Sequence, residues 1–130
     1  MPHVPEVVAS ADRCIVMKPL AQSFGRVTGQ YGPFARLHHA EQLVDTLKAA
    51  HGAGLVHRDV RPANILQASD SEVLLVDWYA AAPAGVPVPW EGTLRCASDR
   101  QLGQLAGGAD ELVPTPADDM SSLVRPCISW

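Results

Sequence analysis

The sequence predicts a single α+β domain that combines a long helix with a β-hairpin. Residues 33–51 carry apolar side chains at intervals of three and four, which is the spacing of an amphipathic helix. Residues 65–66 and 73–76 are short apolar runs on either side of a Ser-Asp-Ser triplet, which is typical of a hairpin. The length of 130 residues fits one domain of about 100–150 residues.

The first predicted element is a strand from Cys14 to Leu20 that Pro19 turns into an extended connector. The helix that follows runs from about Pro33, which suits a first helical turn, to His51, and Gly52 and Gly54 supply its C-terminal stop. Its apolar positions are Leu37, Ala40, Leu43, Val44, Leu47 and Ala50. His38 and His39 on this helix have no spaced third ligand, so we expect a solvated face rather than a zinc site.

After the hairpin, residues 80–90 are mainly Ala, Pro and Val, which predicts an extended loop. A short helix over residues 98–105 should end at Gly107-Gly108. A last helix should begin near Pro116 and end at Pro126, because a proline inside a helix removes a backbone hydrogen bond.

The composition indicates a folded chain and restricts its partners. Apolar residues make up 47% and charged residues 18%, and the mean hydropathy is +0.03, unlike a disordered chain. The formal net charge of −4 gives no reason to expect nucleic-acid binding. No apolar run approaches the ~20 residues of a membrane span, so we expect no membrane partner.

The cysteines and the first residues predict an intracellular, cytoplasmic protein. Cys14, Cys96 and Cys127 are odd in number and far apart, without a C-x-x-C pair, which favours a reducing compartment. The opening residues show no cationic segment followed by an apolar block, as a secretory signal would have.

Three polar residues are candidates for chemistry. Asn64 follows Asp59 by five residues on one tight loop, and Asp77 ends the second arm of the hairpin. Their oxygens are hard ligands of the kind that Mg²⁺ prefers, and a carboxylate free of metal can accept a proton from a hydroxyl nucleophile. Arg61 adds a cation where phosphate charge would need balancing.

The segment that holds these residues resembles the catalytic loop of eukaryotic-type protein kinases. Residues 57–66, HRDVRPANIL, carry the resemblance, and residues 51–56, HGAGLV, are similar to the approach to that loop. Asp77-Trp78-Tyr79 stands where the family has Asp-Phe-Gly, and residues 15–20, IVMKPL, are similar to the last N-lobe strand and hinge. Residues 92–99 look like the end of an activation segment, and residues 119–123, DMSSL, like the start of the central C-lobe helix.

The resemblance implies a catalytic role for each of the loop residues. Asp59 would be the catalytic base, Arg61 would neutralise the transferring phosphate, and Asn64 with Asp77 would hold Mg²⁺. Residues implied to bind the adenine of ATP are Lys18 through its carbonyl, Leu20 through its N–H, and Leu66 as the floor beneath the ring. Residues implied to support the loop are His57 and Trp78, stacked together, and Asp119, capping the loop backbone.

The resemblance also implies an incomplete protein-kinase-like fold, mainly a helical C-lobe with the catalytic-loop hairpin. Residues 1–20 would be a remnant of the N-lobe strand and hinge, residues 21–125 a C-lobe portion, and residues 126–130 a tail. No Gly-rich phosphate loop and no lysine precede the hinge strand.

Two functions follow from the resemblance. The first is ATP-dependent phosphoryl transfer to protein Ser or Thr hydroxyls, since residues 61–64, RPAN, resemble the Ser/Thr type. The second is a non-catalytic pseudokinase fragment that binds a protein partner. A small-molecule phosphotransferase ranks third. Thr93 and Ser98 are either acceptors of a regulatory phosphate or ordinary polar loop residues.

Overall fold

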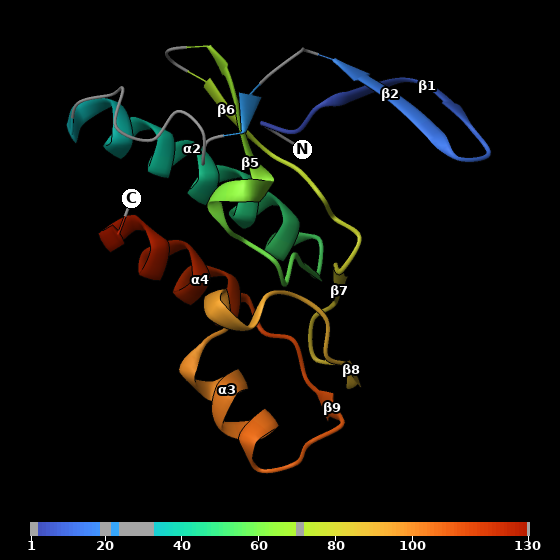
Figure 1. Ribbon diagram of the computed structural model, residues 1–130, viewed down its shortest axis with the longest axis vertical. Coiled ribbons are helices and arrows are strands. Elements are labelled where there is room, and N and C mark those ends of the chain that lie inside the picture. The colour runs from blue at the N-terminus through green and yellow to red at the C-terminus, as the bar shows by residue number, and fades with distance from the viewer. Residues whose placement is uncertain (1–2, 19–21, 24–32, 70–71, 130) are drawn as a thin grey trace.

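The computed structural model of the protein describes residues 3–18, 22–23, 33–69 and 72–129. Two long helices, α2 (Pro33–Gly52) and α4 (Pro116–Ser129), lie side by side, and the shorter α3 (Asp99–Ala106) lies below them in Figure 1. The strands in chain order are β1 (Glu6–Ala11), β2 (Cys14–Lys18), β3 (Gln22–Ser23), β4 (Leu55–Val56), β5 (Ile65–Ser69), β6 (Glu72–Leu75), β7 (Ala82–Pro83), β8 (Val88–Pro89) and β9 (Glu111–Leu112). Short 3₁₀ helices span Pro62–Asn64 and Leu94–Cys96.

The core lies where α2 packs against β6 and α4. Its buried members are Leu43, Leu47, Val60, Ile65, Val73, Leu75 and Leu123. Each large aliphatic side chain buried in this way contributes roughly 1.5–3 kcal/mol. This core fixes the segment of residues 57–66 between the helices and the hairpin, because Val60 and Ile65 of that segment are buried in the core.

The structure confirms helix α2 and corrects the assignment of its faces. The buried stripe runs through His39, Leu43, Leu47 and Ala50, all completely buried, whereas Leu37 is exposed. The expectation of a solvated face is therefore wrong for His39, which lies one turn before Leu43 on the same side of the helix. In the described part of the chain, no helix has the length and apolarity that a membrane crossing requires.

The predicted hairpin is also confirmed. Strands β5 and β6 pair antiparallel with Ile65 opposite Leu75 and Leu66 opposite Leu74, and the register shifts after Gln67. The sequence did not predict β3, which extends this sheet by pairing Ser23 with Leu66. A two-residue strand has too short a pattern to stand out in the sequence.

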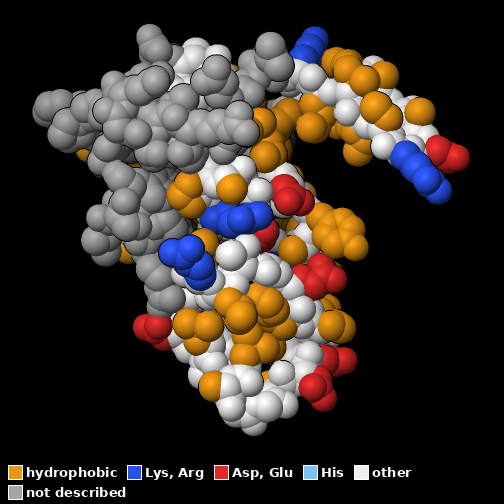
Figure 2. Space-filling view, viewed as in Figure 1, with side chains coloured by type: hydrophobic (Ala, Val, Ile, Leu, Met, Phe, Trp, Pro, Cys, Tyr) orange, Lys and Arg blue, Asp and Glu red, His pale blue; other side chains and the backbone are white. Residues whose placement is uncertain are grey.

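The N-terminal part forms a second hairpin, β1–β2, that protrudes from the rest of the molecule (Figure 1 and Figure 2). Strand β2 confirms the predicted strand as far as Lys18, and its last two predicted residues lie outside the described part. The sequence did not predict β1, whose segment EVVASA has few β-branched residues. All residues of both strands are exposed.

The C-terminal helices confirm one prediction and correct another. Helix α3 begins after Ser98, which forms a capping box with Gln101, and Gly107 follows its end. Helix α4 begins at Pro116 as predicted but continues through Pro126 to Ser129, so the predicted end is wrong. The fixed φ of proline is itself helical, and the backbone loses one hydrogen bond there without breaking. Residues 80–90 form a loop, as predicted, that is extended at two short pairings, β7 to β4 and β8 to β9, and turns between them at residues 84–86.

Candidate functional site

Asp59 lies in the loop between β4 and β5, and three side chains orient its carboxylate. The hydroxyl of Thr93 donates to Oδ1 over 2.7 Å, and the amide of Asn64 donates to Oδ2 over 3.1 Å. Nε of Arg61 lies 3.5 Å from Oδ1. The Asp59 side chain is only 12% exposed, so these contacts hold it in one direction. Thr93 comes from a segment 34 residues away, and its sequence context gave no sign of this contact.

Asn64 and Asp77 are brought together by the backbone of the hairpin. Asn64 ends the short 3₁₀ helix that Pro62 begins, and its carbonyl accepts a 2.9 Å hydrogen bond from the N–H of Val76. Asp77 follows directly and adopts a positive φ of 59°, which turns the chain away from β6. The nearly buried Asn64 amide donates to the Asp59 carbonyl as well as to its carboxylate. The predicted neighbourhood of residues 59 and 64 is confirmed by these bonds.

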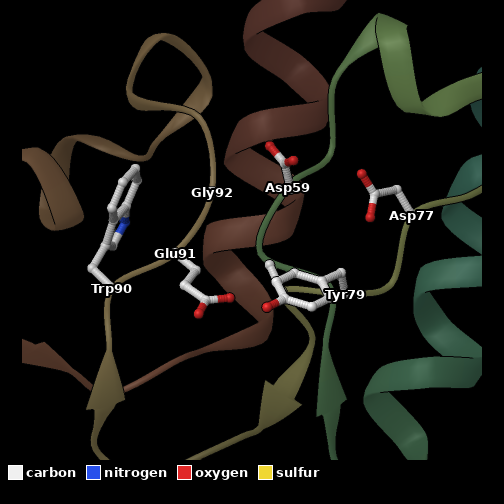
Figure 3. Close-up of a pocket in the computed structure, with 7 residues that line it drawn as sticks. Asp59, Asp77, Tyr79, Trp90, Glu91 and Gly92 are labelled. Carbon is white, nitrogen blue, oxygen red and sulfur yellow. The ribbon is translucent and has the colours of Figure 1, made fainter. Parts of the chain in front are cut away.

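Asp59 and Asp77 line one cavity of about 340 Å³ (Figure 3). Its other walls come from the segment after Asp77 and from the segment before Thr93, and they consist of Tyr79, Ala80, Trp90, Glu91 and Gly92. In Figure 3 the carboxylate of Glu91 points toward the ring of Tyr79, with Asp59 and Asp77 across the cavity. The sequence did not predict a place for Trp90 or Glu91 in a site, because neither belongs to a motif.

The loop that carries Asp59 is anchored to helix α4 by a buried carboxylate. Asp119 accepts hydrogen bonds from the backbone N–H groups of His57 over 2.8 Å and of Arg58 over 2.9 Å. Nε2 of His51 lies 2.8 Å from the same carboxylate. The side chain of Asp119 is 1% exposed, so it replaces water as the partner of these groups. The implied cap of the loop backbone by Asp119 is confirmed.

His57 fixes the loop against the turn at Asp77. Its Nδ1 accepts from the N–H of Asp59 over 3.1 Å, and its Nε2 therefore carries the proton that is donated to the carbonyl of Val76 over 3.0 Å. Burial lowers the pKa of His57, against the opposing effects of the Val76 carbonyl and the nearby aspartates. The ring meets Trp78 edge-on, with centroids 4.5 Å apart, so the implied contact exists as an edge contact rather than a parallel stack.

Arg58 and Asp77 both adopt the left-handed backbone region, with φ of 74° and 59°. A non-glycine residue there costs about 1–2 kcal/mol, which the surroundings must supply. Arg58 is held by its Nε bond to the Ala80 carbonyl and by Nη1, which donates to the Pro89 carbonyl over 2.9 Å. Tyr79 stands where the resembling family has glycine, yet its φ is not positive, and its side chain is 87% exposed.

The residues implied in adenine binding are only partly described. Lys18 ends β2 with an exposed side chain 3.3 Å from Glu6, and Leu20 lies outside the described residues. Leu66 is half-buried in β5, where β3 places Ser23 directly opposite. Strand β3 is thus the described segment that lies next to Leu66 in the sheet.

The side-chain oxygens of Asn64 and Asp77 suit a magnesium ion whose other ligands are water and phosphate oxygens. No group of three His, Cys, Asp or Glu side chains able to hold a metal occurs within the described residues. Asn64 uses its amide N–H groups in the bonds to Asp59, which leaves its side-chain oxygen out of those bonds. Asp77 is exposed and takes part in no ion pair of the described residues. One carboxylate and one amide oxygen fit Mg²⁺, which keeps waters and takes phosphate oxygens.

Comparison with known proteins finds similarity to serine/threonine protein kinases. Serine/threonine-protein kinase PknA of Mycobacterium tuberculosis is 36% identical over 97 residues, which are 74% of this chain and 22% of PknA. The chloroplastic kinase STN8 of Arabidopsis thaliana is 44% identical over 41 residues, 32% of this chain and 8% of STN8. Kinase PKH3 of Saccharomyces cerevisiae is 35% identical over 54 residues, 42% of this chain and 6% of PKH3.

These alignments span less than a quarter of each of the three kinases. No protein-family model matches the chain. The mixture of helices with small antiparallel sheets agrees with an α+β chain. The chain is thus kinase-like in sequence over most of its length, and it is similar to part of those serine/threonine protein kinases.

Proposed function

We propose that the chain is a protein-kinase-like domain whose chemistry is ATP-dependent phosphoryl transfer to protein Ser or Thr hydroxyls. The observation that carries the proposal is the fixed carboxylate of Asp59 on the same cavity as Asp77. Thr93 and Asn64 each take one oxygen of Asp59, so the carboxylate has a set direction before any substrate arrives. Positioning of this kind supplies much of the catalysis in phosphoryl transfer.

In this proposal Asp59 accepts the proton of the substrate hydroxyl. Arg61 stands beside it with a buried Nε that has no hydrogen-bond partner within the described residues. The Arg61 side chain as a whole is 36% exposed, which supports a role for its guanidinium toward a phosphate oxygen. The side-chain distance of 3.5 Å between Arg61 and Asp59 would keep the cation next to the reacting hydroxyl.

The nucleotide would bind beside the β5–β6 hairpin, next to Asn64, Leu66 and Asp77. Asn64 and Asp77 would hold Mg²⁺, which when bound offsets the charge of the ATP phosphates. Leu66, Lys18 and Leu20 would contact the adenine ring, as the resemblance implies. The pairing of β3 with β5 supports this arrangement, because it returns the segment after Lys18 to the strand that holds Leu66.

A melting experiment tests the nucleotide site. Mg-ATP at a hundred times its Kd would stabilise the folded state by about 2.7 kcal/mol, a rise in Tm of several degrees. Asp77→Ala should abolish the rise, whereas Asp110→Ala, at an exposed turn, should keep it. Transfer of labelled phosphate to a serine peptide, abolished by Asp59→Asn, tests the chemistry. No rise in Tm at millimolar Mg-ATP would overturn the proposal.

The second candidate is a non-catalytic pseudokinase module that binds a protein partner. The exposed apolar side chains of the β1–β2 hairpin favour it, namely Val7, Val8, Ile15, Val16 and Met17. The two candidate functions make different predictions for the change in Tm on adding Mg-ATP. A protein partner that binds a chain indifferent to Mg-ATP would favour the module.

A further inference from the structure

The cavity beside Asp59 has an unbalanced charge. Three of its lining residues, Asp59, Asp77 and Glu91, carry carboxylates, and its lining within the described residues includes no lysine or arginine. Asp59 has its own partners, and the proposed function assigns Asp77 to the metal. Glu91 remains, with a side chain 48% exposed at the mouth of the cavity.

Among the described residues, Glu91 has one cationic neighbour, and that neighbour already donates to other groups. Nη2 of Arg58 lies 4.0 Å from the Glu91 carboxylate, the outer limit of an ion pair. The Nε and Nη1 groups of Arg58 donate to the carbonyls of Ala80 and Pro89. The Glu91 carboxylate therefore keeps acceptor capacity for a second cation from outside the chain.

Two aromatic side chains line the same cavity as this carboxylate. Tyr79 and Trp90 both line the cavity, and Figure 3 shows the Tyr79 ring between Glu91 and Asp77. The faces of such rings attract ammonium and guanidinium groups, so aromatic walls with a carboxylate suit a cationic side chain. An anionic side chain would meet three like charges in the same cavity.

The position of Glu91 is fixed relative to the catalytic loop. Gly92 has a φ of 133°, and a Cβ added there would lie 2.6 Å from the carbonyl oxygen of Arg58. The next residue, Thr93, bonds to Asp59. Glu91 therefore directly precedes two residues that contact the loop of Asp59. Gly92 packs against the Arg58 carbonyl, and Thr93 bonds to the Asp59 carboxylate, which would orient the substrate hydroxyl.

We infer that Glu91 determines substrate specificity, by receiving an arginine or lysine side chain near the Ser or Thr that accepts the phosphate. This inference rests on the proposed function, because it assumes that the substrate hydroxyl lies at Asp59. Tyr79 and Trp90 form the walls for the aliphatic stem and the charged end of the substrate side chain.

Peptide binding tests the inference separately from catalysis. A labelled serine peptide with two flanking arginines is compared, by fluorescence anisotropy, with peptides that carry glutamines or glutamates instead. The arginine peptide should bind the most tightly, and Glu91→Gln should weaken it about fivefold without weakening the glutamine peptide. Glu91→Lys should reverse the preference between the arginine and glutamate peptides. The matched control is Glu41→Gln, which removes a somewhat more exposed carboxylate on helix α2 and should change nothing.

Several results separate this inference from the proposed function. Equal binding of the arginine and glutamine peptides, no binding of any peptide, or equal losses in the Glu91 and Glu41 variants each overturn the role of Glu91. If wild-type protein shows the Mg-ATP stabilisation in the same preparation, the proposed function survives that outcome. If the preference for the arginine peptide depends on Glu91 while Mg-ATP does not raise the Tm, Glu91 does bind a cationic side chain. The proposed phosphoryl transfer is then overturned.

Discussion

Two segments, the β1–β2 hairpin and the loop over residues 57–64, are held in opposite ways. Every strand residue of the hairpin is exposed, and its apolar side chains contact water. The loop has little regular structure, yet Asp119, Thr93 and the ring of His57 bond it to distant segments. Backbone pairing alone leaves a two-stranded ribbon marginal, whereas buried side-chain bonds fix an irregular loop. Rigidity here follows the tertiary bonds rather than the secondary structure.

The largest expected effect comes from removing the anchor of the loop. Asp119→Ala would leave two backbone N–H groups and His51 without their buried acceptor, and each unsatisfied group costs about 1–3 kcal/mol. We expect a loss of about 3–5 kcal/mol in the free energy of unfolding, measured by urea denaturation. The control is Asp45→Ala on the exposed side of α2, which should stay within about 0.5 kcal/mol. Equal effects of the two substitutions would show that the anchor does not fix the loop.

The next effect comes from the close contact at Gly92. Gly92→Ala would put a Cβ 2.6 Å from the Arg58 carbonyl, so the segment that carries Glu91 and Thr93 would have to shift. We expect a cost of about 2–3 kcal/mol in the free energy of unfolding. Gly85→Ala is the matched control, since Gly85 has φ of +80° with nothing within 4 Å of the added Cβ. It should cost only about 1 kcal/mol, from the backbone alone, and a Gly92 variant no worse than this would contradict the contact.

The features that the sequence predicted are mainly those whose residues lie close together along the chain. Local patterns predicted α2, the β5–β6 hairpin and the start of α4, because periodicity and caps lie within one segment. The motif order predicted that Asp119 caps the loop, a contact over more than sixty residues. Thr93 on Asp59 and the walls formed by Trp90 and Glu91 have no local pattern, so only the folded chain reveals them. The helix through Pro126 was missed because a proline predicts a helix end, although its fixed φ is itself helical.

A smaller effect should appear in the pH dependence of the loop. Burial lowers the pKa of His57 below its ordinary value, so the folded state favours the neutral ring that bonds to Asp59 and Val76. The unfolded state then binds more protons below about pH 6.5, so stability is present above that value and is lost as the pH falls through the folded pKa. His57→Phe should flatten the fall in Tm between pH 7 and pH 5. His38→Gln, at an exposed histidine of α2, should leave that fall as steep as in wild type.

The smallest effect is expected in the β1–β2 hairpin. Ile15 is 61% exposed and Val16 is 50% exposed. Replacing either with threonine therefore removes little buried apolar surface and keeps the β-branched shape. We expect each free energy of unfolding to change by less than about 0.5 kcal/mol, and amide exchange in β1 and β2 to be faster than in β5 and β6. Leu47→Ala in the core is the reference and should cost about 2–5 kcal/mol. A hairpin substitution that costs more than about 1.5 kcal/mol would mean that its apolar side chains are buried in solution. Concentration-dependent stability would then identify a second copy of the chain as what buries them.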